Sequence, residues 1–117
     1  MTQEFGEPGV ENPRVVDLVS PDPKSGAAVL LMIERRPWNG TQTQLRELEE
    51  KINRYLGYAL DGFLVEHYPQ YEGKSVRVQL DCVEEPHGEA AEFLRDARRV
   101  AEEEGIEFVV NVTQKHT

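Results

Sequence analysis

The apolar and polar positions along the chain form short blocks, and these blocks predict four strands and two helices. Residues 14–19 and 27–34 are rich in valine, leucine and isoleucine, and a stretch that holds two prolines and a glycine separates them. This arrangement is typical of a β-hairpin with a loop longer than the tightest type. Two more strands are predicted at 75–82, where apolar and polar residues alternate strictly, and at 106–112.

Apolar residues at steps of three and four predict the two helices. The first helix begins at Thr41, which fits a capping box with Gln44, and its apolar face continues to Leu64. Gly62 weakens this helix by about 1 kcal/mol relative to alanine and allows a bend there. The second helix is predicted over 89–104, and the glycine that follows it is a good left-handed stop.

The order β-β-α-β-α-β predicts an α+β fold with two layers. The first two strands are antiparallel, and each helix is a crossover between parallel strands. Because such crossovers are right-handed in nearly all proteins, both helices fall on one face of a four-stranded mixed sheet. We expect a single domain over 14–113, preceded by a flexible arm at 1–13, rich in glycine and proline, and followed by a polar tail at 114–117.

This architecture leaves one face of the sheet uncovered. With Val29, Leu31 and Ile33 turned toward the helices, the uncovered face has an apolar centre and charged flanks, a composition common in interfaces. We therefore expect a homodimer, or another protein partner, against this face or its adjoining edge. The alternative is that the N-terminal arm folds over the face. The interface residues predicted in this way are Leu30, Met32, Arg77, Gln79 and Val109.

The charge and the cysteine content exclude several classes of function. The 22 acidic and 13 basic residues give a formal net charge of −9, which disfavours binding to nucleic acid or to an anionic membrane. The single cysteine, Cys82, rules out an intramolecular disulfide and a cysteine zinc site, and its place in the alternating strand indicates a buried structural thiol. We find no signal peptide or membrane span and expect a cytoplasmic protein.

No catalytic motif is present, and the sequence predicts neither a metal site nor a cofactor. The best candidate for a small-molecule site is the carboxyl edge of the sheet, because open parallel sheets bind ligands there. Arg35 and Arg36 would hold an anion, Trp38 would cover it, and Asp81 would supply an acid or base. The alternative, which we favour, is an ordinary polar rim in which Trp38 caps the core.

Four stretches of the sequence carry a resemblance: DLVSPDP at 17–23, RPWNG at 36–40, YALDG at 58–62 and VQLDC at 78–82. With them, the chain from about residue 15 to residue 112 resembles a family of small bacterial proteins described only as a domain of unknown function. The resemblance implies a bacterial, cytoplasmic, stand-alone domain, and it brings no activity or catalytic residue with it.

Two functions from different classes follow. The first, which we favour, is a non-enzymatic interaction or regulatory module that forms a homodimer or binds a protein partner. The second is a binding protein for a small anionic ligand, or a minor enzyme, that uses the carboxyl edge of the sheet.

Overall fold

The computed structural model describes residues 18–113; the predicted arm, the beginning of the first predicted strand and the polar tail lie outside this range. The predicted order of strands and long helices is confirmed, with a short extra helix and a 3-10 turn after the first long helix. The elements are β1 (Leu18–Pro21), β2 (Ala28–Glu34), α1 (Gln42–Leu60), α2 (Phe63–His67), the 3-10 turn (Pro69–Tyr71), β3 (Val76–Cys82), α3 (Gly88–Glu103) and β4 (Glu107–Val112).

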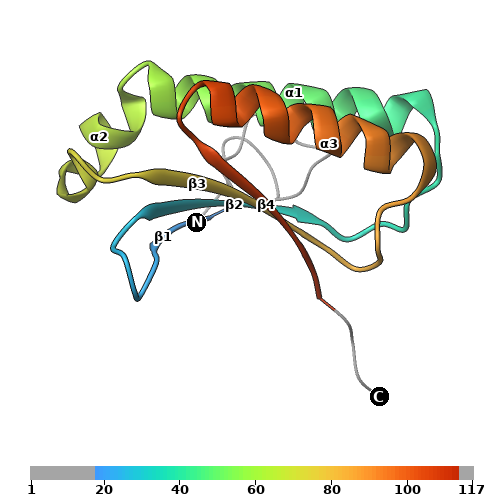
Figure 1. Ribbon diagram of the computed structural model, residues 1–117, viewed down its shortest axis with the longest axis horizontal. Coiled ribbons are helices and arrows are strands. Elements are labelled where there is room, and N and C mark those ends of the chain that lie inside the picture. The colour runs from blue at the N-terminus through green and yellow to red at the C-terminus, as the bar shows by residue number, and fades with distance from the viewer. Residues whose placement is uncertain (1–17, 114–117) are drawn as a thin grey trace, which may run out of the picture.

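The strands form one sheet in the order β1-β2-β3-β4, in which β1 is antiparallel to β2 and the other neighbours are parallel. The long helices α1 and α3 lie side by side over one face of this sheet, as Figure 1 shows. The predicted two-layer architecture is therefore confirmed. Both helices cover the same face because each connects parallel strands that follow one another in the same direction across the sheet.

The hairpin between β1 and β2 is closed by Asp22. Its carboxylate accepts hydrogen bonds from the Ser25 hydroxyl at 2.8 Å and from the Lys24 amide at 3.3 Å. Gly26 then adopts a φ of +77°, a conformation that glycine takes without strain. Its amide donates a hydrogen bond to the Asp22 carbonyl at 2.8 Å. Short polar side chains that bond to nearby backbone are the usual reason for a turn at such a position.

The predicted cap of α1 is confirmed. The Thr41 hydroxyl accepts a hydrogen bond from the Gln44 amide at 3.2 Å. The return contact differs from a simple capping box, because the Gln44 side chain accepts from the Asn39 amide at 3.0 Å and the Asn39 side chain accepts from the Thr41 amide at 3.0 Å. The cap thus includes the loop that leads into the helix.

The long helix that the sequence predicts through Leu64 is divided. The helix α1 ends at Leu60, and Gly62 adopts a left-handed φ of +89° before α2 begins. The apolar spacing continues across this break, and Leu64 is still buried at 2% exposure. Glycine at the break therefore changes the helix direction without changing which side faces the core.

The predicted orientation of β2 is wrong. Leu30 and Met32 are fully buried between the sheet and the helices, and Leu30 lies in register with Val78 of β3. Tyr55 of α1 reaches this layer and donates a hydrogen bond to the Leu31 carbonyl at 2.7 Å. Because successive side chains of a strand point to opposite faces, the β2 residues on the open face are those we had predicted in the core: Val29, Leu31 and Ile33.

Candidate interaction surfaces

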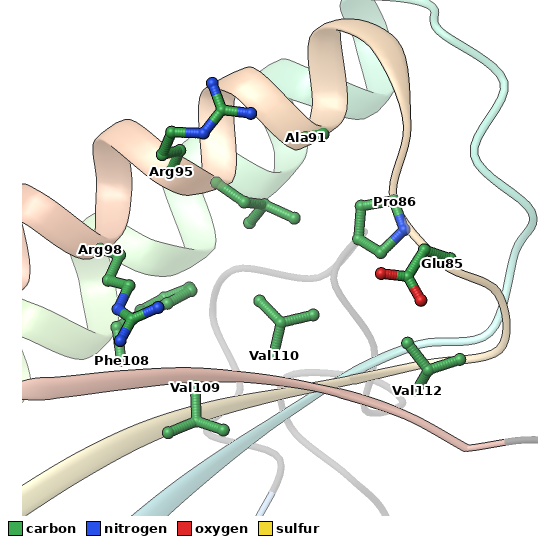
Figure 2. Close-up of a pocket in the computed structure, with 10 residues that line it drawn as sticks. Glu85, Pro86, Ala91, Arg95, Arg98, Phe108, Val109, Val110 and Val112 are labelled. Atoms are coloured by element: carbon green, nitrogen blue, oxygen red, sulfur yellow. The ribbon is translucent and has the colours of Figure 1, made fainter.

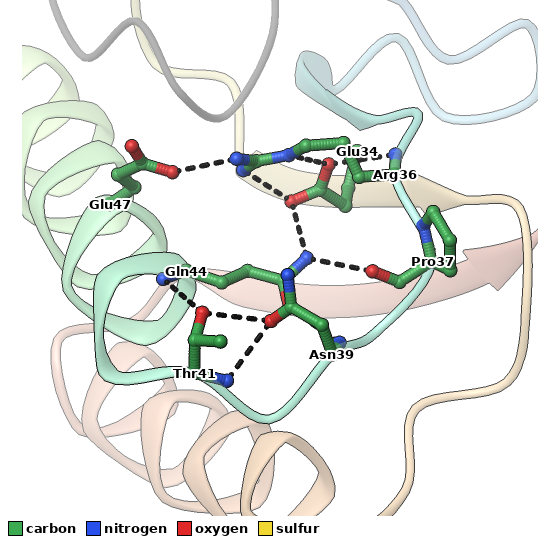
Figure 3. A network of polar contacts seen from close by, with 7 residues as sticks. All are labelled: Glu34, Arg36, Pro37, Asn39, Thr41, Gln44 and Glu47. Atoms are coloured by element: carbon green, nitrogen blue, oxygen red, sulfur yellow. Dashed lines mark hydrogen bonds and ion pairs between the residues drawn. The ribbon is translucent and has the colours of Figure 1, made fainter.

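A buried carboxylate organises the loop edge of the sheet, where β2 leads into α1. Glu34 is fully buried, and its Oε1 accepts hydrogen bonds from the Arg36 amide at 3.0 Å and from Arg36 Nε at 2.9 Å. Its Oε2 accepts from Arg36 Nη2 at 2.8 Å and from Gln44 Nε2 at 3.2 Å, a network drawn in Figure 3. The carboxylate is thus surrounded by donors, which is what a buried charge requires.

Arg36 is held by a second carboxylate as well. Its Nη1 lies 2.9 Å from Glu47 Oε1 on α1, and these contacts with Glu34 and Glu47 raise the pKa of the Arg36 guanidinium. The guanidinium therefore joins the end of β2 to the first turns of α1. Its charge is neutralised within the protein, so an anionic ligand would have to displace a carboxylate to bind it.

Trp38 is 5% exposed and packs against the core. Its indole Nε1 donates to the Glu84 carbonyl at 2.9 Å, and its amide donates to Glu84 Oε1 at 3.3 Å. These bonds connect the loop after β2 with the loop after β3. This placement matches the alternative in which Trp38 caps the core.

The four predicted ligand residues do not form one cluster. Arg36 contacts residues on the helix side, Trp38 is buried, and Arg35 is exposed in the loop. Asp81 lies on the opposite face, in register with Ile33, where it accepts hydrogen bonds from Gln79 at 2.9 Å and from Asn111 at 3.1 Å. Asp81 therefore belongs to the open face of the sheet.

The open sheet face has an apolar centre on β2. Strand β1 adds to this apolar surface, because Leu18 lies in register with Leu31 of β2. The Leu18 side chain is 50% exposed. Val109 of β4 adds a separate apolar residue, since Gln79 of β3 lies between it and Leu31. The predicted interface residues Arg77, Gln79 and Val109 thus lie on this face. Leu30 and Met32 do not, because β2 presents its other side.

The charged residues around this face are paired with one another. Arg77 contacts Asp22 of the hairpin at 3.2 Å and Glu107 of β4 at 3.0 Å. The hydrogen bond that Arg77 Nε donates to Glu107 is the main reason that the pKa of Arg77 is raised. The polar rim of the open face is therefore largely satisfied within the chain.

A groove that the sequence did not predict lies between α3 and β4, with a volume of about 420 Å³. Figure 2 shows Arg98 reaching from α3 toward Phe108, and Glu85 at the other end of the groove, near Val112. The only sequence signal was the presence of arginines among the apolar positions of α3, which does not by itself predict a groove. The lining residues are Glu85, Pro86, Ala91, Leu94, Arg95, Arg98, Phe108, Val109, Val110 and Val112.

The predicted structural role of Cys82 agrees with its surroundings. The thiol is 1% exposed, and burial raises its pKa to about 11, which keeps it protonated at neutral pH. Within residues 18–113, no group of three or more histidine, cysteine, aspartate or glutamate residues is arranged to hold a metal ion. None of the helices in this range is both long and apolar enough to cross a membrane.

Comparison with known proteins places the chain in a family without assigning it an activity. No curated protein matches the chain, and no solved structure matches it. A family model described as a family of unknown function, DUF6572, matches residues 9–114, which is most of the chain. The protein therefore belongs to the DUF6572 family of unknown function.

Proposed function

We propose that the protein is a non-enzymatic interaction module whose open sheet face is covered by a second copy of the chain or by another protein. The observation that supports this most directly is the composition of that face. Leu18, Leu31 and Val109 supply apolar surface from different strands, and Leu18 is half exposed. The apolar surface of Leu18 and Leu31 spans two neighbouring strands, and Val109 lies beyond the polar Gln79 of β3. Exposed apolar surface rimmed by polar residues is characteristic of protein interfaces.

The internal pairing of the charges favours burial of this face. Covering an unpaired charge costs several kcal/mol, whereas the groups that surround the apolar centre already have partners. Arg77 is bound by Asp22 and Glu107, and Asp81 is bound by Gln79 and Asn111. Because these side chains are already partly buried, a partner gains for each of them a part of the about 1.5–3 kcal/mol that full burial of a large apolar side chain contributes, and Arg77 is covered together with its carboxylate partners.

A homodimer is the first form to test, because two sheets can pack face to face at about 10 Å with interdigitating side chains. The bacterial and cytoplasmic setting that the sequence suggests belongs to the same proposal. One buried free thiol and no other cysteine are usual in a reducing compartment.

The test is a charge placed at the centre of the face. Leu31→Glu is expected to weaken association by at least about tenfold, because the carboxylate would be buried without a partner. The matched control is Leu60→Glu, which makes the same change at a residue of α1 that is 49% exposed. Light scattering coupled to size-exclusion chromatography measures the mass of each variant, and circular dichroism checks that both are folded.

A parent protein that is monomeric at high micromolar concentration would exclude the homodimer. If the parent is monomeric and a pull-down also finds no partner whose binding is lost in Leu31→Glu, the open face is not an interface. A dimer that persists in Leu31→Glu would show that association uses another surface.

Anion binding at the loop edge is the less favoured proposal. Its arginine is already held by two carboxylates and its tryptophan is buried, so neither is placed to receive a ligand. Native mass spectrometry of the freshly purified protein tests it: a co-purifying anion that is lost in Trp38→Ala would revive this function.

A further inference from the structure

The two edges of the sheet are different. The edge strand β1 has four residues and ends at Pro21, and proline cannot donate a hydrogen bond to a neighbouring strand. The other edge strand, β4, has six residues with no proline, lysine or arginine, and within residues 18–113 no strand pairs with its outer side. Proteins usually protect such edges, so an unprotected edge beside a groove indicates a place for another strand.

The direction of the backbone groups in β4 follows from its pairing with β3. Thr113 donates its amide to the Cys82 carbonyl at 2.8 Å, so its backbone points toward β3. Backbone groups alternate along a strand, and therefore Glu107, Val109 and Asn111 also point toward β3. The residues between them, Phe108, Val110 and Val112, direct their N–H and C=O groups outward.

The same three residues form the floor of the groove. Phe108 is 2% exposed on the helix side of the sheet, and Val110 and Val112 line the groove on that side. A strand added along β4 would thus find free backbone groups and apolar side chains at the same positions. Alternate side chains of the added strand would enter the groove beneath α3.

The charges around the groove indicate what kind of strand fits. Although the chain has a net charge of −9, the α3 wall of the groove carries Arg95 and Arg98. Arg98 shares an exposed ion pair with Glu102 at 3.1 Å, a contact that is weak in water and easily exchanged. Glu85 lines the other end of the groove, so the two arginines favour a peptide whose carboxylates lie at the Arg95 and Arg98 end.

We propose that this groove binds an extended, acidic peptide segment of a partner protein, which adds to the sheet as a fifth strand along β4. Alternate side chains of the segment are apolar and pack on Val110 and Val112, which are partly exposed. Its backbone bonds to β4, and at least one of its carboxylates pairs with Arg95 or Arg98. A second copy of β4 is a poorer occupant. Two-fold pairing of β4 with β4 would bring the arginines of both α3 helices toward each other, and like charges oppose such an interface. Peptide addition at β4 does not depend on what covers the open sheet face.

The probe is a library of random dodecapeptides displayed on phage and selected against the purified full chain. We expect the selected peptides to be acidic with alternating apolar residues, and amide chemical shifts of residues 107–113 to change when a selected peptide binds. Backbone N-methylation of that peptide, one residue at a time, is expected to reduce affinity by about tenfold at every second position. An N-methyl group removes the hydrogen bond only where the amide faces β4.

Charge reversal tests the arginines. The double variant Arg95→Glu/Arg98→Glu is expected to bind the selected peptide at least about tenfold more weakly. Its matched control, Arg46→Glu/Arg99→Glu, changes the net charge equally at exposed arginines outside the groove and is expected to bind like the parent.

Four results would overturn the proposal. One is a selection that enriches no peptide or only basic ones. Another is an N-methylation effect without the alternation, because it would show that the peptide does not lie as a strand. The third is loss of binding in both arginine variants alike, which would indicate long-range attraction and not a site. If instead the parent dimerises and shifts of residues 107–113 depend on its own concentration, the occupant is a second copy and the peptide proposal is wrong.

Discussion

The salt bridge at the end of β2 gives the sharpest prediction about stability. Arg36→Ala removes the Nε and Nη2 donors, which lie 2.9 Å and 2.8 Å from the Glu34 carboxylate, and leaves this carboxylate, fully buried in the parent, without its arginine. Only the backbone amide of residue 36 and Gln44 Nε2 then remain as donors. Breaking a buried ion pair from one side costs about 3–5 kcal/mol. Because the Arg36 side chain is 35% exposed, water can enter when it is removed, and we expect about 3 kcal/mol.

A loss of this size is a large share of the roughly 5–15 kcal/mol that a domain has available. It corresponds to a decrease in Tm of roughly 12–24 °C for a domain of about this size. Urea unfolding followed by circular dichroism measures the change in the free energy of unfolding. The fluorescence of Trp38, the only tryptophan, reports on the loop beside the network, and coincident transitions from the two probes would support two-state unfolding.

The double variant Glu34→Gln/Arg36→Ala isolates the cause of the loss. If the cost of Arg36→Ala comes from an unpaired buried charge, neutralising Glu34 should restore about 1 kcal/mol or more. The control is Arg46→Ala, which removes an exposed arginine of α1. Its free energy of unfolding is expected to stay within about 0.5 kcal/mol of that of the parent. The reasoning is refuted if Arg36→Ala is as mild as this control, or if the double variant is less stable than Arg36→Ala.

Two further predictions concern single residues. Gly62→Ala is expected to destabilise the fold by about 1–2 kcal/mol because φ is +89° there, whereas Gly57→Ala, inside α1, should be neutral or stabilising by up to about 1 kcal/mol. An added Cβ at Gly57 meets only Asp61 Oδ2, at 3.7 Å, so urea unfolding of the two variants should give opposite signs; equal losses would contradict this account. The Cys82 thiol should react with a disulfide reagent at pH 7.5 far more slowly in the native protein than in urea, because burial raises its pKa to about 11; equal rates would show that the strand opens readily.

The sequence was sufficient to predict the order and connection of the elements. Strict alternation in residues 75–82 and the three-four spacing of the helices each have one physical interpretation. The β2 strand has no such alternation, because residues 27–33 are all apolar and either face can be the buried one. The charged Glu34 lies on the same face of the strand as Leu30 and Met32. A charged residue normally marks the exposed face, so the pattern predicts the opposite of the orientation that the structure has. Its burial depends on Arg36 and Gln44, a tertiary contact that periodicity does not contain.

The candidate sites show the same limit. Sequence placed the basic residues after β2 and Asp81 near the carboxyl end of β3, but it did not determine on which side of the sheet each side chain would lie. The groove was missed because its wall and floor belong to different elements, α3 and β4. A groove between them depends on how far the helix stands from the last strand, and this distance is set by packing that no single segment encodes.

The parallel connections of the sheet have a consequence for how the chain folds. The strand β2 is apolar on both faces, and its neighbour β3 arrives only after all of α1 and α2. Each parallel pairing must close a loop that contains a whole helix, and the lost entropy is recovered only once the strands meet. Folding should therefore be slow for a chain of this length. Until β3 is in place, residues 28–34 are the segment most prone to join another unfolded chain, so the same apolar strand that forms the centre of the native sheet is also its main aggregation hazard.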